Sequence, residues 1–182
     1  MAKIKGVALV GLVKALRALR KDSEAKLPAM LRHYLDERVI VSDWYSEEDY
    51  RVLILTLGEL IADKVPGNVW EFLGEEGAKA QLGATYAPVV TKGDPLRTLK
   101  RAPMTWALYH DTGRVKVDID ETRRTARVEL HGYPIACPRI CASTTGYLRQ
   151  LLIQSGTRTA TVGMTVCPRP EEGPVIWVAA WE

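Results

Sequence analysis

The three cysteines are the residues of this sequence best suited to redox or metal chemistry. Cys137 and Cys141 lie four positions apart, and Cys167 follows later in the chain. A secreted disulfide framework normally uses an even number of cysteines, so we expect reduced thiols. The four-position spacing also differs from the Cys-x-x-Cys motif of thiol oxidoreductases. It favours thiols that pack in the core or at the start of a helix.

Other chemical motifs in the sequence are incomplete. The histidines His33, His110 and His131 show no i, i+4 spacing that would place two of them on one helix face. Gly6 and Gly11 have the spacing of a phosphate loop, but the lysine and the hydroxyl residue of that motif do not follow them. No serine stands in a Gly-x-Ser-x-Gly motif. We therefore expect a protein that acts by binding and not by catalysis.

Composition indicates a single domain without nucleic-acid or membrane partners. The chain has 182 residues, 47% of them hydrophobic, which is enough for one sizeable core over residues 1–182. No apolar run approaches the roughly 20 residues that span a bilayer. No secretion signal is recognisable either, so we expect a cytoplasmic protein. Lys and Arg exceed Asp and Glu by 25 − 22 = 3, too small a surplus for a dedicated nucleic-acid binder.

Apolar residues at three- and four-residue steps predict helices in the chain before about Gly113. Ser46 and Asn68 are each followed three residues later by an acidic residue, which is typical of a helix N-cap. The acidic residues 47–49 suit the positive end of a helix dipole, and we interpret them as solubilising charges. The expected helices are Ile4–Leu19, Glu24–Asp36, Glu47 to about Lys64, one that follows Asn68, and one that follows Asp94-Pro95 and is interrupted by Pro103.

Three glycines interrupt the helix expected after Asn68. Gly74, Gly77 and Gly83 each cost about 1 kcal/mol relative to alanine in a helix. Glycines kept at that cost usually indicate close approach by another backbone or by a ligand.

After Gly113 the apolar spacing changes to alternation, which predicts strands. Two alternating runs, Arg114–Asp120 and Ala126–Leu130, predict an antiparallel hairpin. A helix from about Cys141 to Gln154 follows, and then two strands over Thr157–Cys167 and Val175–Trp181. The fold class is therefore α+β, with about five helices followed by a ββαββ antiparallel sheet.

This order of elements resembles a superfamily of three groups: heme-nitric-oxide/oxygen-binding (H-NOX) domains, vinyl-reductase-type sensory domains and the small subunits of TRAPP vesicle-tethering complexes. Within that superfamily, five short segments look like a large paralogous family of myxobacteria. They are Ile4-Lys-Gly-Val-Ala-Leu-Val10, Trp44-Tyr-Ser-Glu-Glu-Asp-Tyr50, Trp70-Glu-Phe-Leu-Gly74, Gly93-Asp-Pro-Leu96 and Trp106.

The resemblance implies a non-enzymatic cytosolic domain that senses a ligand or binds another protein. Because domains of this superfamily often form dimers, it implies a homodimer. It also implies a hydrophobic pocket between the helices and the sheet, where a small apolar ligand could bind. Aromatic side chains are the natural lining of such a pocket, although core packing would explain any one of them equally well. The candidate pocket residues are Trp44, Tyr45, Trp70, Phe72, Tyr86 and Trp106.

The same resemblance implies an alternative, a metal-binding or heme-binding sensor of gas or redox state. In the heme branch a histidine before the sheet ligates iron, and His110 is the histidine of that region. The Tyr-x-Ser-x-Arg motif that pairs with heme propionates does not occur in this chain. In some vinyl-reductase-type domains cysteines bind zinc, and Cys141 and Cys167 resemble two of those positions. Cys137 or His131 would have to complete the set of three or four ligands that zinc needs.

Overall fold

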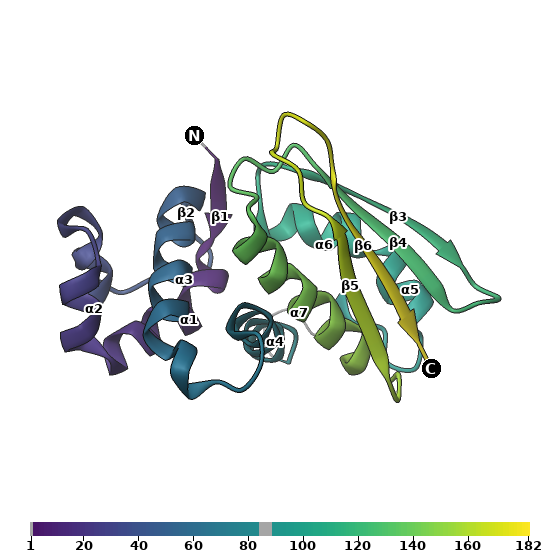
Figure 1. Cartoon of the computed structure of the whole chain (residues 1–182), viewed down its shortest axis with the longest axis horizontal. Helices are drawn as coiled ribbons and strands as arrows, with labels where there is room; N and C mark the ends of the chain where they lie inside the picture. Colours follow the sequence, from purple (N-terminus) through teal and green to yellow (C-terminus); the bar gives the residue numbers. More distant parts are fainter. Residues whose placement is uncertain (1, 84–88) are drawn as a thin grey trace.

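The computed structural model describes residues 2–83 and 89–182, and the predicted order of helices followed by ββαββ is confirmed. The N-terminal helices lie at one end of the molecule and the larger sheet at the other, with α4 and α7 between them (Figure 1). The elements are β1 (Lys3–Lys5), α1 (Gly6–Ala18), α2 (Arg20–Lys26), η1 (Ala29–Leu35), β2 (Trp44–Ser46), α3 (Glu47–Ile61), η2 (Ala62–Lys64), α4 (Val69–Leu82), α5 (Pro95–Lys100), α6 (Ala102–Tyr109), β3 (Arg114–Asp120), β4 (Thr125–His131), α7 (Pro138–Gln154), β5 (Ala160–Val166) and β6 (Val175–Trp181).

The first two expected helices differ from the observed ones in ways that backbone pairing and proline explain. Lys3–Lys5 pairs antiparallel with Trp44–Ser46, so the first helix begins only at Gly6. The second expected helix is divided at Pro28, because proline disfavours helical backbone in the residue before it. Leu27 is accordingly extended, and the chain continues as the 3₁₀ helix η1.

The predicted helix starts are confirmed at three positions. The Ser46 hydroxyl accepts hydrogen bonds from the backbone N–H groups of residues 48 and 49 at the start of α3. The Asn68 side chain does the same for residues 70 and 71 of α4. Asp94 accepts from the N–H of residue 97 at the start of α5. Each cap satisfies donors that have no partner inside the helix.

Two groups of buried apolar side chains form the interior. We call the first the N-terminal cluster; it joins β1, α1, η1 and α3. We call the second the sheet cluster; it joins the four-stranded sheet to α4 and α7. The N-terminal cluster consists of Ile4, Leu9, Val13, Leu16, Leu27, Leu31, Tyr34, Leu35, Leu53 and Leu57. Members of the sheet cluster include Ala78, Leu99, Val128, Leu130, Tyr133, Cys141, Leu151, Leu152, Trp177 and Trp181. Three half-buried side chains, Leu12, Tyr50 and Leu73, pack against both clusters.

The larger sheet has the strand order β3-β4-β6-β5, and every neighbouring pair is antiparallel. Val128 lies opposite Val117 in one neighbouring strand and opposite Trp177 in the other, so these side chains share one face. The helices α6 and α7 pack on that face.

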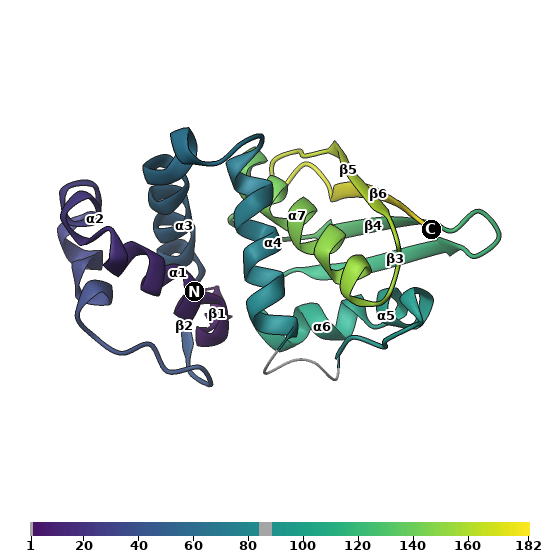
Figure 2. The ribbon, with the colours of Figure 1, turned by 90° about the horizontal axis from the view of Figure 1, so that it is seen from below.

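Helices α4 and α7 lie side by side with their backbones in contact (Figure 2). A Cβ atom added to Gly74 would lie 1.8 Å from the carbonyl oxygen of Ser143, and one added to Gly146 would lie 1.9 Å from that of Glu71. The close approach expected from the glycines of α4 is therefore found at Gly74, and its partner is another helix. At Gly77 the nearest atom would be 3.8 Å away, so that glycine contributes nothing to the contact.

No helix in the described part of the chain combines the length and the apolar character that crossing a membrane requires.

Candidate functional site

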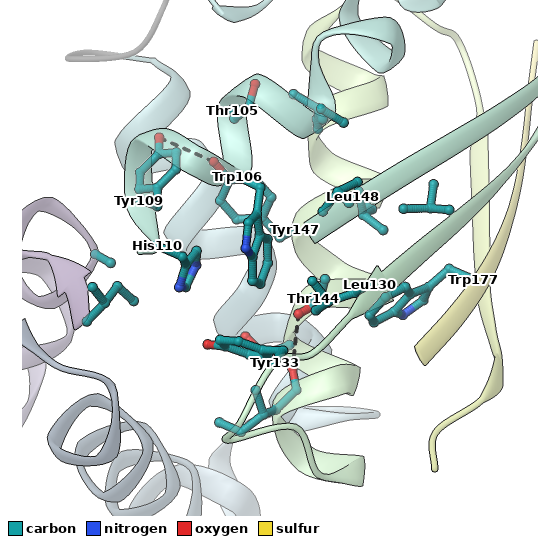
Figure 3. Close-up of a pocket in the computed structure, with 18 of the residues that line it drawn as sticks. Thr105, Trp106, Tyr109, His110, Leu130, Tyr133, Thr144, Tyr147, Leu148 and Trp177 are labelled. Carbon is teal, nitrogen blue, oxygen red and sulfur yellow. Dashed lines mark hydrogen bonds between the residues drawn. The ribbon is translucent and has the colours of Figure 1, made fainter. Parts of the chain in front are cut away.

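A small cavity lies between α6, α7 and the inner face of the larger sheet. Its volume is about 120 Å³. Trp106 of α6, Leu130 of β4 and Leu148 of α7 line it (Figure 3). Ile4 of β1 and Ala8 of α1 complete the wall on the N-terminal side. The cavity therefore lies between the helices and the sheet, where the resemblance implied a pocket.

His110 brings an imidazole to this wall, and a buried carboxylate holds it in place. Nδ1 of His110 lies 2.8 Å from Oε1 of Glu47, and the Thr112 hydroxyl donates to Oε2 of Glu47 at 2.9 Å. The Glu47 side chain is completely buried and that of His110 is 11% exposed. Because a carboxylate only accepts, Nδ1 of a neutral His110 carries the proton. Nε2 is then an acceptor.

Three titratable side chains of the cavity, His110, Tyr50 and Tyr133, are neutral near pH 7. Burial lowers the pKa of His110 below its ordinary value, and the hydrogen bond to Glu47 opposes this shift without reversing it. Burial raises the pKa of Tyr50 to about 12. It also raises the pKa of Tyr133 well above its ordinary value, and the charge of Glu47 adds to that shift. The cavity thus offers hydrogen-bonding groups without a charge of its own.

Two aromatic rings fix the orientation of the imidazole. The Trp106 ring stacks on the His110 ring, with centroids 3.9 Å apart and planes at 15°. The Tyr133 ring is nearly perpendicular to both rings, and its centroid lies 5.3 Å from that of His110 and 4.9 Å from that of Trp106. The Trp106 indole N–H donates to the carbonyl of Thr112 at 2.8 Å. These contacts leave the imidazole one packed arrangement against α6.

The turn that follows α6 positions His110. Gly113 has a φ of +76°, in the left-handed region that favours glycine, and it turns the chain into β3. The N–H of Lys3 donates to Oδ1 of Asp111 at 2.6 Å, and the N–H of Asp111 donates to the carbonyl of Lys3 at 3.0 Å. Strand β1 is therefore bonded to the turn next to His110, which explains why Ile4 reaches the cavity.

Of the five predicted pocket residues that the structure describes, Trp106 lines the cavity. Trp44 is 41% exposed beneath the Lys5 ammonium, and the Tyr45 hydroxyl accepts from the N–H of Ile40. The Trp70 ring covers Gly58, which has no side chain to displace it. The two remaining residues are Phe72, which is 37% exposed on α4 and does not line the cavity, and Tyr86, which lies outside the described residues.

Sequence reasoning missed the most important acid of the site. We interpreted Glu47 as a solubilising charge of the first helical turn, but its side chain is completely buried. Its position in sequence is 63 residues from His110, so no local pattern relates them. No local signal in the sequence separates Glu47 from the next acid, Glu48, whose side chain is exposed.

The cysteines and His110 are not brought together as one metal set. Cys141 and Cys167 are in contact, and Cys137 is the residue before the first turn of α7. His110 is bonded to Glu47, and His131 is bonded to Glu129. Among the residues that the structure describes, no three His, Cys, Asp or Glu side chains are arranged to hold a metal ion.

Comparison with solved structures shows that this chain has an H-NOX-like fold. An H-NOX protein from S. oneidensis in the Fe(II)NO ligation state is 12% identical, with a TM-score of 0.66 over 98% of this chain and 99% of that one. An unliganded Fe(II) H-NOX mutant from K. algicida is 10% identical, with a TM-score of 0.69 over 98% and 97% of the two chains. No family model and no curated protein matches the sequence.

The side chains around the cavity do not fit a heme. Heme needs an axial ligand and partners for its carboxylates, and the described lining residues include no arginine or lysine. The His110 ring lies flat against Trp106. Ligand pockets usually measure roughly 300–1,000 Å³, and heme is a large ligand, whereas this cavity measures about 120 Å³. As these side chains are packed, the cavity suits a much smaller molecule.

Proposed function

We propose that this chain is a non-enzymatic sensory domain that binds one small, mostly apolar molecule in the cavity beside His110. The observation that carries the proposal is a neutral imidazole, fixed by the buried Glu47 at 2.8 Å, in an otherwise largely apolar wall. The H-NOX-like fold supports a sensory role, because an H-NOX protein of this fold was solved in the Fe(II)NO ligation state.

The size of the cavity limits the ligand. An engineered apolar protein cavity of roughly 150 Å³ holds benzene, and the present cavity of about 120 Å³ is slightly smaller. We therefore propose a ligand of about five or six non-hydrogen atoms. At a ceiling of about 1.5 kcal/mol per atom, five atoms bind no more tightly than about 3 µM.

The tautomer of His110 decides which hydrogen-bonding group the ligand must carry. Since Nδ1 donates to Glu47, Nε2 offers a lone pair. A molecule with one N–H or O–H group can donate to Nε2 and bury the rest of its surface against Trp106 and Leu148. A molecule with only an acceptor would leave Nε2 unpaired, and an unpaired buried polar group costs about 1–3 kcal/mol.

Pyrrole and furan test this proposal as a matched pair. Both are five-membered rings of the same shape, but pyrrole has an N–H donor and furan has only an acceptor. We expect pyrrole to quench the fluorescence of Trp106 and to bind at least about tenfold more tightly than furan, which corresponds to 1.4 kcal/mol. Equal binding of the two rings would contradict the role of Nε2, and binding of neither at millimolar concentration would contradict the proposed ligand size.

Filling the cavity gives a second test with a control on the same helix. Ala102 lines the cavity, whereas Ala107 is exposed on the same helix α6. We expect Ala102→Leu to abolish pyrrole binding and Ala107→Leu to leave it unchanged, since only the first side chain occupies the ligand volume. Melting temperatures of both variants show that they remain folded. Pyrrole binding that survives Ala102→Leu would place the ligand elsewhere.

Titration with hemin tests the heme alternative. We expect no stoichiometric Soret band from the folded protein, because neither the volume nor the charge of the cavity suits the macrocycle. A Soret band that saturates at one hemin per chain and is lost in His110→Gln would overturn the small-ligand proposal.

The predicted cytoplasmic homodimer is part of the same proposal. Light scattering coupled to size-exclusion chromatography measures it directly, and we expect a mass of twice 20.3 kDa. A mass of one chain at every concentration would contradict the dimer and leave the ligand proposal intact.

A further inference from the structure

Two of the three cysteines meet outside the set of residues that line the cavity, although Cys141 directly follows the lining residue Ile140. Cys141 lies in the first turn of α7 and is 1% exposed, and Cys167 directly follows β5 and is half-buried. The Cys167 thiol donates to Sγ of Cys141 at 3.2 Å. We propose that Cys141 and Cys167 are a redox-active pair that hydrogen peroxide converts into an intramolecular disulfide.

The two sulfur atoms need only a short movement to form a disulfide bond. Bonded sulfur atoms lie about 2.05 Å apart, so the two sulfurs must approach by about 1.2 Å. Cys141 is fixed in the helix, where its N–H donates to the carbonyl of Cys137 at 2.8 Å. Cys167 follows a register irregularity between Met164 and Val166 and begins the connection to β6. The side of the pair that can move is therefore Cys167.

The two thiols have different roles because their surroundings differ. Burial and the neighbouring Cys167 raise the pKa of the Cys141 thiol well above its ordinary value. A thiolate and not a thiol is the nucleophile, so Cys141 is a poor first attacker. Cys167 is half-buried and reaches solvent, where a peroxide can meet it. Cys167 is thus the residue oxidised first, and Cys141 is the resolving thiol.

The reaction balances in two steps. The Cys167 thiolate attacks one oxygen of hydrogen peroxide, the O–O bond breaks, and hydroxide leaves with a sulfenic acid on Cys167. The Cys141 thiol passes its proton to the sulfenic oxygen, the resulting thiolate sulfur attacks the Cys167 sulfur, the S–O bond breaks, and the oxygen leaves as water. Overall, two thiols lose two electrons, the peroxide gains them, and two water molecules form.

The product would tie the start of α7 to the end of β5. A cross-link between residues 26 positions apart removes conformational freedom from the unfolded chain. For a chain of this length we expect oxidation to raise the melting temperature by about 5–10 °C. Reduction with dithiothreitol should return it to the starting value.

Trypsin distinguishes the possible pairings, because each cysteine falls on a different peptide. Cys137 lies in Val128–Arg139, and Cys141 lies in Ile140–Arg149. Cys167 lies in Thr159–Glu182, since trypsin does not cut before Pro170. After treatment of the reduced full chain with peroxide and blocking of free thiols, we expect mass spectrometry to find Ile140–Arg149 linked to Thr159–Glu182.

Single serine variants provide the control. Cys167→Ser changes a half-buried side chain and should abolish the peroxide-dependent rise in melting temperature. Cys137→Ser changes an equally half-buried thiol, but it should leave both the cross-link and the rise unchanged. A disulfide between Cys137 and Cys141, one between two chains on a non-reducing gel, or three unmodified thiols after peroxide treatment would each overturn the proposal.

Discussion

The N-terminal cluster and the sheet cluster differ in what fills them. Nine of the ten residues in the N-terminal cluster are Leu, Ile or Val, and the tenth is Tyr34. The sheet cluster contains Tyr133, Trp177 and Trp181 together with a buried thiol, and the cavity lies along its edge. Side chains in protein cores interdigitate closely, whereas aromatic pairs prefer a few offset or edge-to-face arrangements. The difference teaches that the cavity lies in the half of the fold where aromatic side chains fill the core.

Polar groups join the two regions. Glu47 begins α3 in the N-terminal region, and its partners His110 and Thr112 come from the turn before the sheet. Lys3 and Asp111 form two further hydrogen bonds across the same boundary. A buried carboxylate with two donors is costly to separate from them. We therefore expect the boundary to hold until the whole chain unfolds.

The largest expected effect tests whether the two clusters unfold together. Leu16 of the N-terminal cluster and Leu152 of the sheet cluster are both 0% exposed. We expect Leu16→Ala and Leu152→Ala each to lower the free energy of unfolding by about 3 kcal/mol. Urea denaturation followed by circular dichroism and by tryptophan fluorescence should show one coincident transition in both variants.

Leu108→Ala is the control for this pair, because Leu108 is 40% exposed, and it should change stability far less. Two separate transitions in either core variant would show that residues 1–182 do not form the single domain predicted from the sequence.

The next effect concerns the contact between α4 and α7. A methyl group at Gly146 would collide with the backbone of Glu71, whereas one at Gly77 meets no atom within 3.5 Å. We expect Gly146→Ala to destabilise the protein by at least about 2 kcal/mol. Gly77→Ala should instead stabilise it by about 0.5–1 kcal/mol through helix propensity. Thermal denaturation measures both, and equal effects of the two substitutions would contradict the backbone contact.

Removing the charge of Glu47, which joins the two clusters, should lower the free energy of unfolding less than Gly146→Ala does. Glu47→Gln keeps the shape of the side chain, but its amide cannot accept from both His110 and Thr112. We expect a loss of about 1–2 kcal/mol in the free energy of unfolding. Nitrogen-15 chemical shifts of His110 should also report a change of tautomer, since Nδ1 can then accept from the amide. An unchanged tautomer would contradict the role given to Glu47.

The smallest effect is a dependence of stability on pH. Because the pKa of His110 is lowered in the folded protein, the unfolded chain binds protons more readily as the pH falls through about 6.5. Stability should therefore decrease from pH 8 to pH 5, with a contribution below about 1.4 kcal/mol per pH unit.

His110→Gln should lose this contribution, and His33 and His131 remain in both proteins as an internal reference. Identical pH profiles of the variant and the wild type, measured by urea denaturation, would show that burial does not lower the pKa of His110.

Local patterns predicted the fold well and the site poorly. Alternation predicts the limits of β3 and, to within one residue at each end, those of β4, and the side chains of Ser46, Asn68 and Asp94 mark three helix starts. These features depend on neighbours a few positions away. The pairing of Lys3–Lys5 with β2 could not be predicted in this way, because its partner lies about 40 residues further along.

The site depends on contacts that are distant in sequence. Trp106 was selected because it is aromatic, but the same criterion selected Trp44 and Phe72, which are partly exposed. Nothing in the sequence near Glu47 distinguishes it from the exposed Glu48. Burial and partners are set by tertiary packing, so only the folded chain separates a cavity-lining ring from a surface ring.

The backbone contact of α4 and α7 has a mechanical consequence. No layer of side chains separates the two helices at Gly74 and Gly146, so no change of rotamer can let one helix slide past the other. We therefore expect α4 and α7 to move as one rigid unit. The opposite wall of the cavity is formed by the three-residue strand β1 and the short helix α6. If the proposed ligand binds, we expect this wall to move first, and Ile4 to pass the displacement to α1.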